Sequence, residues 1–118
     1  MRTVGRGLRV VGALVAFGAL VSQAVAAPPA VSAAQAQELY RTTCQKCHGP
    51  EGNAPQKGEG LSFADGEWNH GADLRSIVAV ITNGVPETGM RPFKDKLSAA
   101  EIQALAKYVR SLDKHLKE

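Results

Sequence analysis

The residue pattern with the most specific chemistry is Cys44-Gln45-Lys46-Cys47-His48. Two thiols three positions apart can each add across one vinyl group of the same haem, and the adjacent histidine is then held under the ring, where it can bind the iron. The protein has two cysteines, and this pattern uses both. The spacing therefore predicts one covalently attached haem c, with Cys44 and Cys47 as attachment points and His48 as an axial ligand.

Two other cysteine chemistries are alternatives to haem attachment. A disulfide between Cys44 and Cys47 would make a thioredoxin-like redox motif, but that motif belongs to a βαβ setting, and the sequence has no strand pattern. A zinc site would need a further ligand, which His70 or His115 would have to supply. Haem attachment is preferred because it uses both thiols and the adjacent histidine together.

Met90 is the predicted second axial ligand. Once a leader containing Met1 is removed, Met90 is the only methionine, and it lies in a loop rather than on an apolar helix face. A thioether is a soft ligand that favours reduced iron, so a His/Met pair raises the reduction potential relative to two histidines. The alternatives are that Met90 fills a gap in the core, or that His70 or His115 takes the sixth position.

Three helices with start signals are predicted to position these groups. Ser32 with Gln35 and Ser98 with Glu101 each match the pattern of a capping box, and Asp73 can cap a helix between them. In the second and third segments apolar residues recur at the spacing of a helix face. These positions are Leu74, Ile77, Val78 and Ile81 in the second helix, and Ile102, Leu105, Ala106, Val109 and Leu112 in the last.

The segments between the helices have the composition of irregular loops. Residues 49–60 contain four glycines and two prolines, and residues 85–96 are punctuated by two prolines and a glycine. Asn83-Gly84 supplies a left-handed stop for the second helix. No strand pattern and no internal repeat occurs in the sequence, so an all-α fold is predicted.

The N-terminal residues are predicted to be a signal peptide. Three arginines among the first nine residues precede twelve apolar or glycine residues, and a small-x-small cleavage site ends at Ala26, with Ala27 as the alternative. The apolar run is short of the ~20 residues that a membrane span needs, and an uncleaved anchor is the alternative. The domain is therefore expected in the periplasm. The predicted division is a signal peptide at 1–26, a linker at 27–31 and one domain at 32–118.

Charge and composition exclude some classes of protein. The chain has 14 Lys and Arg against 11 Asp and Glu, and three of the arginines belong to the leader. The remaining charges balance, so nucleic-acid binding, which needs a basic patch on the mature domain, loses its main support. Six aromatic residues offer little bulk for a core, which a buried cofactor would supply.

Basic residues near the motif or the Met90 loop either steer an acidic partner or form an ordinary solvated face. They are Lys46, Lys57, Arg91, Lys94 and Lys96.

Together these features resemble class I cytochrome c. The resemblance rests on the motif that ends at His48, the loop containing Met90, and a C-terminal helix carrying Leu105 and Tyr108, and it covers roughly residues 32–112. It implies a small cytochrome c fold, with three or more helices wrapped around one covalently bound haem. It also implies that His48 and Met90 are the axial ligands and that the protein transfers single electrons.

The resemblance implies roles for three further residues. Ala36 and Tyr40 map to the crossing of the first and last helices, where a glycine is more usual than Ala36. Trp68 maps to an indole whose N–H lies near a haem propionate. Arg91 stands where many relatives have proline, which puts a charge beside the haem edge.

The predicted function is that of a periplasmic single-electron carrier, which is not an enzyme. Its partners would be redox proteins that serve as electron donor and acceptor, and it would contact a membrane only through an uncleaved leader or a membrane-bound partner. One alternative is a haem-containing subunit of a dehydrogenase or terminal oxidase complex. Another is a haem enzyme or gas-binding protein, which would need an open iron position.

Overall fold

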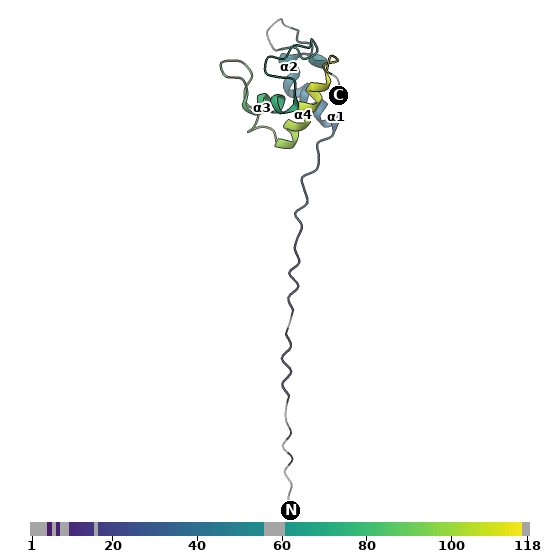
Figure 1. Cartoon of the computed structure of the whole chain (residues 1–118), viewed down its shortest axis with the longest axis vertical. Coiled ribbons are helices and arrows are strands. Elements are labelled where there is room, and N and C mark those ends of the chain that lie inside the picture. Colours follow the sequence, from purple (N-terminus) through teal and green to yellow (C-terminus); the bar gives the residue numbers. More distant parts are fainter. Residues whose placement is uncertain (1–4, 6, 8–9, 16, 56–60, 117–118) are drawn as a thin grey trace, which may run out of the picture.

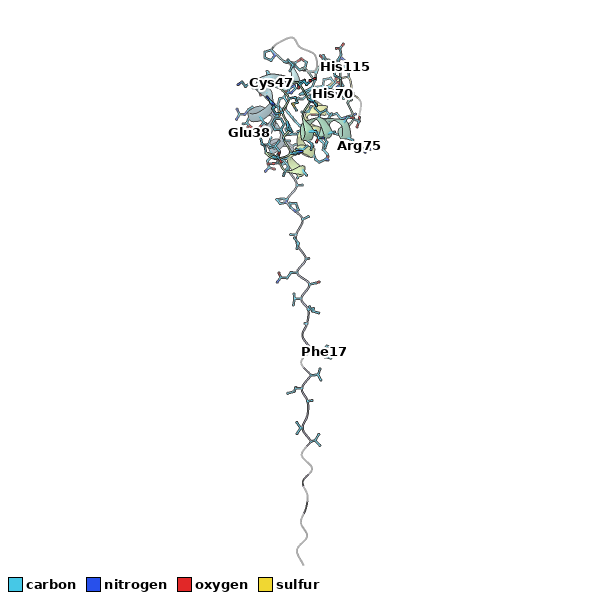
Figure 2. All side chains as sticks on the ribbon, turned by 90° about the vertical axis from the view of Figure 1, so that its left-hand side faces the viewer. Phe17, Glu38, Cys47, His70, Arg75 and His115 are labelled. Atoms are coloured by element: carbon cyan, nitrogen blue, oxygen red, sulfur yellow. The ribbon has the colours of Figure 1, made fainter. Side chains whose placement is uncertain are left out.

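The computed structural model describes residues 5, 7, 10–15, 17–55 and 61–116. The described part of the chain before Val31 has no regular secondary structure and runs away from the helices (Figure 1), with Phe17 fully separate from them (Figure 2). Among the described residues, no helix is long and apolar enough to cross a membrane. The three leader arginines, Arg2, Arg6 and Arg9, and also Lys57, lie outside the described residues.

The helix that leads into the cysteine motif begins at the predicted capping box. The backbone N–H of Ser32 donates to Gln35 Oε1 at 2.8 Å, and the N–H of Gln35 donates to Ser32 Oγ at 3.2 Å. Helix α1, Ala33–Leu39, continues without a break into a π-helical segment, Tyr40–Cys44, and then into the short helix α2, Gln45–His48. The start and the absence of a breaker are confirmed, whereas the π-helical segment was not predicted.

The motif is followed by a glycine that the backbone conformation requires. Gly49 has φ 75°, and a Cβ atom there would lie 1.7 Å from the carbonyl oxygen of Asn53. Only glycine combines this left-handed conformation with so close an approach. The chain then makes a single 3₁₀ turn at Pro50–Gly52 inside the predicted loop.

The other two helices also begin where the sequence predicts. Helix α3, Leu74–Asn83, is capped by Asp73, whose Oδ1 accepts the N–H of Ser76 at 3.0 Å. Helix α4, Ala99–Ser111, has the second capping box. Of the four predicted apolar positions in α3, Ile77 and Ile81 are buried, but Leu74 in the first turn is 37% exposed.

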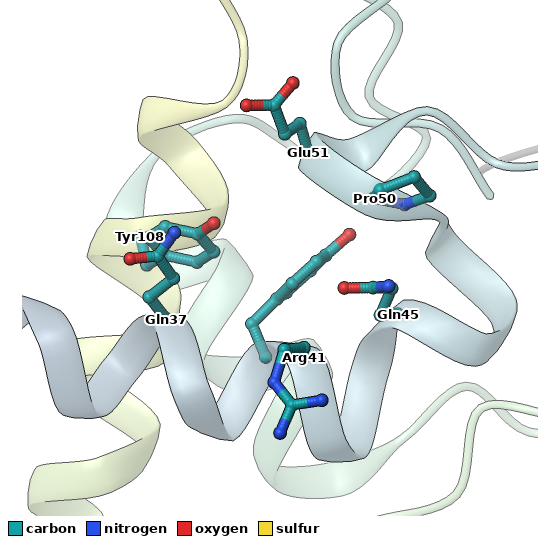
Figure 3. Close-up of a pocket in the computed structure, with 7 residues that line it drawn as sticks. Gln37, Arg41, Gln45, Pro50, Glu51 and Tyr108 are labelled. Atoms are coloured by element: carbon teal, nitrogen blue, oxygen red, sulfur yellow. The ribbon is translucent and has the colours of Figure 1, made fainter.

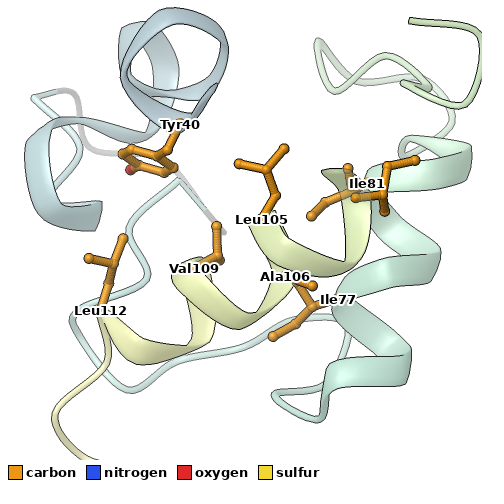
Figure 4. Close-up of a cluster of buried hydrophobic side chains, with 8 residues drawn as sticks. Tyr40, Ile77, Ile81, Leu105, Ala106, Val109 and Leu112 are labelled. Carbon is orange, nitrogen blue, oxygen red and sulfur yellow. The ribbon is translucent and has the colours of Figure 1, made fainter. Parts of the chain in front are cut away.

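The core forms where α4 packs against both α1 and α3. Ala36 and Tyr40 are each 1% exposed and Leu105 is fully buried, which confirms the predicted crossing of the first and last helices. The Tyr40 ring meets Tyr108 edge-on with centroids 5.3 Å apart, and its hydroxyl donates to the Gly49 carbonyl at 2.7 Å. The all-α prediction is confirmed, since the described residues contain no strand. The buried cluster (Figure 4) is Tyr40, Ile77, Ile81, Ile102, Leu105, Ala106, Val109 and Leu112.

We expect Leu105→Ala to lower the free energy of unfolding by roughly 2 to 5 kcal/mol, because it leaves a cavity at the helix crossing. Chemical denaturation of the intact protein, followed by circular dichroism, measures the change. Gln103→Ala is the matched control, because Gln103 is exposed on the same helix. A loss for Leu105→Ala no larger than that of the control would contradict the assigned crossing.

Candidate functional site

The two cysteine thiols are free but differ in environment. Cys44 is half-buried and packs against the buried cluster, whereas Cys47 is exposed. Burial raises the pKa of the Cys44 thiol to about 11. Redox-catalytic cysteines have lowered pKa values, so Cys44 does not have the character of a thioredoxin-type nucleophile. In the described part of the chain, no three His, Cys, Asp or Glu side chains are grouped to hold a metal ion.

His48 is held through one of its two ring nitrogens. Its Nδ1 lies 2.7 Å from the Leu61 carbonyl oxygen. Because a carbonyl can only accept, Nδ1 must carry the proton and donate it, which leaves the lone pair of Nε2 free. Burial lowers the pKa of the imidazole, which keeps the ring neutral. A neutral imidazole oriented by a backbone carbonyl is the form in which histidine binds metals.

A stack of aromatic rings covers His48. The Phe63 ring lies nearly parallel to the imidazole, with centroids 4.4 Å apart and planes at 26°. The Trp68 ring then stacks on Phe63 at 5.6 Å and 17°. Three residues of the loop after the motif, Leu61, Phe63 and Trp68, therefore fix the imidazole directly or through one another.

The indole N–H of Trp68 has a partner that the sequence analysis missed. It donates to Asp113 Oδ2 at 2.8 Å, and Asp113 is only 3% exposed. The hydrogen bond from Trp68 is the main cause that holds the pKa of the Asp113 carboxyl below its ordinary value. Burial acts in the opposite direction, and the backbone N–H of His115 lowers the pKa further. The available signal was chemical, because a buried indole N–H needs an acceptor. The contact of Trp68 with a propionate stays a prediction.

The Met90 loop is held by its own backbone and by Thr88. The N–H of Val85 donates to the Met90 carbonyl at 2.9 Å, and the Met90 N–H donates to Thr88 Oγ1 at 3.1 Å. Thr88 Oγ1 in turn donates to the Val85 carbonyl at 2.7 Å. Glu87 completes this turn with φ 61°, a left-handed conformation that glycine favours. Both polar backbone groups of Met90 are thus fixed, and its half-buried side chain packs against the core cluster.

The two competing histidines are placed differently. His70 is exposed in a turn, and His115 uses Nδ1 to contact Asp113 Oδ1 at 2.9 Å. Both side chains are exposed, whereas the Met90 side chain is half-buried against the core cluster. This placement favours Met90 as the second ligand over either histidine.

A pocket of about 110 Å³ lies where the π-helical segment, α2 and the 3₁₀ turn meet Gln37 of α1 and Tyr108 of α4 (Figure 3). Its lining includes the polar side chains Gln37, Arg41 and Glu51, with Tyr108 on the α4 side. Neither cysteine, His48 nor Met90 lines it. The pocket is therefore separate from the candidate site.

Four large apolar side chains are only partly covered by the protein's own core. Phe63, Trp68, Met90 and Phe93 pack against the core cluster but are only partly buried. Partly exposed apolar groups of this size are costly unless something covers them. An apolar macrocycle attached at the motif would supply that cover, so the residues present fit a haem.

Comparisons with known proteins agree with this reading. The family model described as cytochrome C oxidase, cbb3-type, subunit III matches residues 31–109. The chain is 34% identical over 116 residues to the cbb3-type cytochrome c oxidase subunit FixP of Azorhizobium caulinodans, covering 86% of this chain and 39% of that protein. It therefore spans less than half the length of the oxidase subunits it matches.

Smaller proteins match over most of their length. A cytochrome c6-like protein of Nostoc sp. is 32% identical over 97 residues, which are 81% of this chain and 85% of that protein. The solved structure of the KustC0563 c-type cytochrome is 41% identical with a TM-score of 0.57, covering 67% of this chain and 98% of that one. With the motif and the helical fold, these matches show that the chain belongs to the monohaem class I c-type cytochromes, whose members carry one covalently attached haem c.

Proposed function

We propose that this chain is a periplasmic electron carrier whose haem c is attached to Cys44 and Cys47, with His48 and Met90 as axial ligands. The observation that carries the proposal is the 2.7 Å contact between His48 Nδ1 and the Leu61 carbonyl. It fixes the tautomer that leaves Nε2 free, next to two free thiols at the spacing that haem attachment needs. When bound, the haem supplies a one-electron redox centre.

The protein's own residues orient and shield that centre. The Leu61 carbonyl holds the His48 ring, and the bond makes the imidazole a better electron donor. Thr88 and Val85 fix the backbone of Met90, so that its side chain needs little reorganisation to remain in place. Phe63, backed by Trp68, covers one face of the His48 ring. A rigid, closed site of this kind suits electron transfer rather than substrate chemistry.

The leader supports the proposed location. We assign residues 1–26 as a signal peptide, followed by a linker at 27–31, because a positive start, an apolar run and a small-x-small site occur in that order. An exported domain meets redox proteins on the far side of the membrane. Its electron donor and acceptor would therefore be periplasmic proteins or membrane complexes with exposed periplasmic surfaces.

A second candidate function is favoured by one specific observation. The matching family model describes subunit III of a cbb3-type oxidase, and one relative named as such a subunit, FixP, aligns with 86% of this chain. The chain would then deliver electrons within a terminal oxidase complex. Purification from native membranes under mild detergent separates the two candidates, because a subunit would co-purify with the oxidase and a free carrier would remain in the periplasmic fraction.

Voltammetry of the purified protein tests electron carriage. We expect a reversible one-electron wave, and no binding of carbon monoxide by the reduced form, because Met90 closes the iron. A wave that is irreversible, or ready binding of carbon monoxide, would instead support a haem enzyme or gas-binding protein.

Thr88→Val should loosen the loop that holds Met90 while leaving the Met90 side chain itself in place as the iron ligand. The isosteric side chain loses both hydrogen bonds of the hydroxyl, which are together worth about 1 to 3 kcal/mol. The conformation with an open iron is then more populated, so the apparent affinity of the oxidised protein for added imidazole should rise by about fivefold to a hundredfold. Thr88→Ser is the control, because it keeps the hydroxyl. Equal imidazole affinities in wild type and Thr88→Val would show that the hydroxyl does not hold Met90.

A further inference from the structure

Asp113 is the only charged residue that is buried in the described part of the chain, and the proposed function does not use it. Its Oδ2 accepts the indole N–H of Trp68 at 2.8 Å. Its Oδ1 accepts the backbone N–H of His115 at 2.8 Å and lies 2.9 Å from the His115 Nδ1. A carboxylate is costly to bury unless both oxygens have donors, and here both do. So complete a set of partners places this side chain in one fixed position.

The bond from Trp68 is the link between Asp113 and His48. Trp68 and Asp113 are 45 positions apart in sequence, so their hydrogen bond ties the loop after the motif to the end of helix α4. Trp68 stacks on Phe63 and Phe63 stacks on the His48 imidazole, with interplanar angles of 17° and 26°. Displacement of the indole would therefore remove the backing of Phe63 and free the His48 ring to tilt.

Several contacts hold the loop, among them a bond of 3.1 Å from Arg110 Nε to the Ala72 carbonyl, and two of the others lie close to the aromatic stack. Near its start, the backbone N–H of Phe63 donates to the Gly52 carbonyl at 2.8 Å. Toward its end, Gly66 lies against His115, since a Cβ atom on Gly66 would be 3.1 Å from the His115 Nδ1. The second anchor is thus the Asp113–His115 corner, which follows directly on the most deeply buried helix. The Leu61 carbonyl that accepts from His48 belongs to the same loop.

We infer that Asp113 is a positioning residue for the His48 ligand, acting through Trp68 and Phe63. The charge-assisted bond to the indole holds the aromatic stack, and the stack keeps the imidazole plane aligned with the Leu61 carbonyl. This inference rests on the proposed function, in which His48 binds the iron. A firm Nδ1–H bond increases electron donation by the imidazole and stabilises oxidised iron. Loosening the anchor should therefore raise the reduction potential.

Exchange of the His48 Nδ1 proton provides a direct readout. In the reduced, diamagnetic protein this proton is observable by ¹⁵N-edited NMR, and its exchange with solvent requires opening of the bond to Leu61. Trp68→Phe keeps an aromatic ring in the stack but removes the donor to Asp113. We expect the exchange to become about tenfold faster and the potential to rise.

Asp113→Asn and the double variant separate positioning from charge. The asparagine keeps an oxygen acceptor but replaces a charge-assisted bond with a weaker neutral one, so exchange should accelerate less than in Trp68→Phe. Combined with Trp68→Phe it should add nothing further to the exchange rate, because the bond is already absent. A pure charge effect would raise the potential of Asp113→Asn with no change in exchange, and would overturn the inference.

Ile102→Val is the control for general destabilisation. Ile102 is buried on the same helix but lies outside the stack, so the variant should unfold more easily with unchanged His48 exchange. Acceleration in this control equal to that in Trp68→Phe would show that exchange reports only global stability, and the positioning role would be wrong. Haem staining of every sample distinguishes failure of this inference from failure of the proposed function. Haem-containing Trp68→Phe with wild-type exchange overturns the inference alone, whereas a wild type without haem overturns the proposed function and the inference with it.

Discussion

Replacing Met90 with alanine will open the sixth coordination position of the iron and turn a closed carrier into a protein that binds carbon monoxide. The thioether stabilises reduced iron, so its loss should also lower the reduction potential. The weak sulfur-to-iron charge-transfer band of the oxidised protein should disappear. The fold should survive, because the two thioether bonds and His48 still hold the haem. Visible spectroscopy with and without carbon monoxide, together with voltammetry, measures these changes.

Arg91→Gln is the matched control for the Met90 substitution. Arg91 is exposed in the same loop and directly follows the ligand. Its substitution should leave the charge-transfer band intact and the reduced iron closed to carbon monoxide. If Met90→Ala retains the spectrum and potential of the wild type, Met90 is not a ligand, and His70→Ala becomes the next variant to measure.

Substitution of both motif cysteines by serine should abolish haem attachment and leave the domain largely unfolded. The buried hydrophobic cluster contains eight residues, and larger side chains such as Phe63 and Trp68 are only partly buried against it. So small an interior does not offset the conformational entropy of the chain without a cofactor that binds the folded state. Far-UV circular dichroism of the purified variant should show little helix at 25 °C.

The single variants provide the graded comparison. Cys44→Ser and Cys47→Ser can each retain at most one thioether bond, and should fold only to the extent that they keep haem. A double variant with the helical content and cooperative unfolding of the wild type would show that the protein interior alone specifies the fold.

The helix boundaries were predictable because their causes are local. The capping boxes at Ser32 and Ser98 each join groups three residues apart, so a short stretch of sequence contains both partners. The π-helical segment Tyr40–Cys44 was not predictable in this way, because no residue type marks the change in hydrogen-bond register. Leu74 lies at the spacing of the apolar face but is partly exposed. Periodicity identifies the face of a helix, but it does not show how far along the helix a neighbouring element covers that face.

Within the candidate site, the sequence indicated side chains but not their supports. The motif and Met90 were identifiable from residue type and spacing. The acceptor for His48 is the carbonyl of Leu61, and a backbone group has no sequence signature. The acceptor for Trp68 is Asp113, and a hydrogen bond between residues so far apart in sequence leaves no periodic pattern. Such supports become visible only when the fold brings distant segments together.

The central claim is that haem is covalently attached to this chain at Cys44 and Cys47. Mass spectrometry of the protein purified from the periplasm, after denaturation and reduction, tests it most directly. The account predicts the mass of residues 27–118 plus one haem, and a proteolytic peptide containing the Cys44–His48 motif that carries the haem. A colourless denatured protein with the mass of the polypeptide alone, and with both thiols open to alkylation, would contradict it.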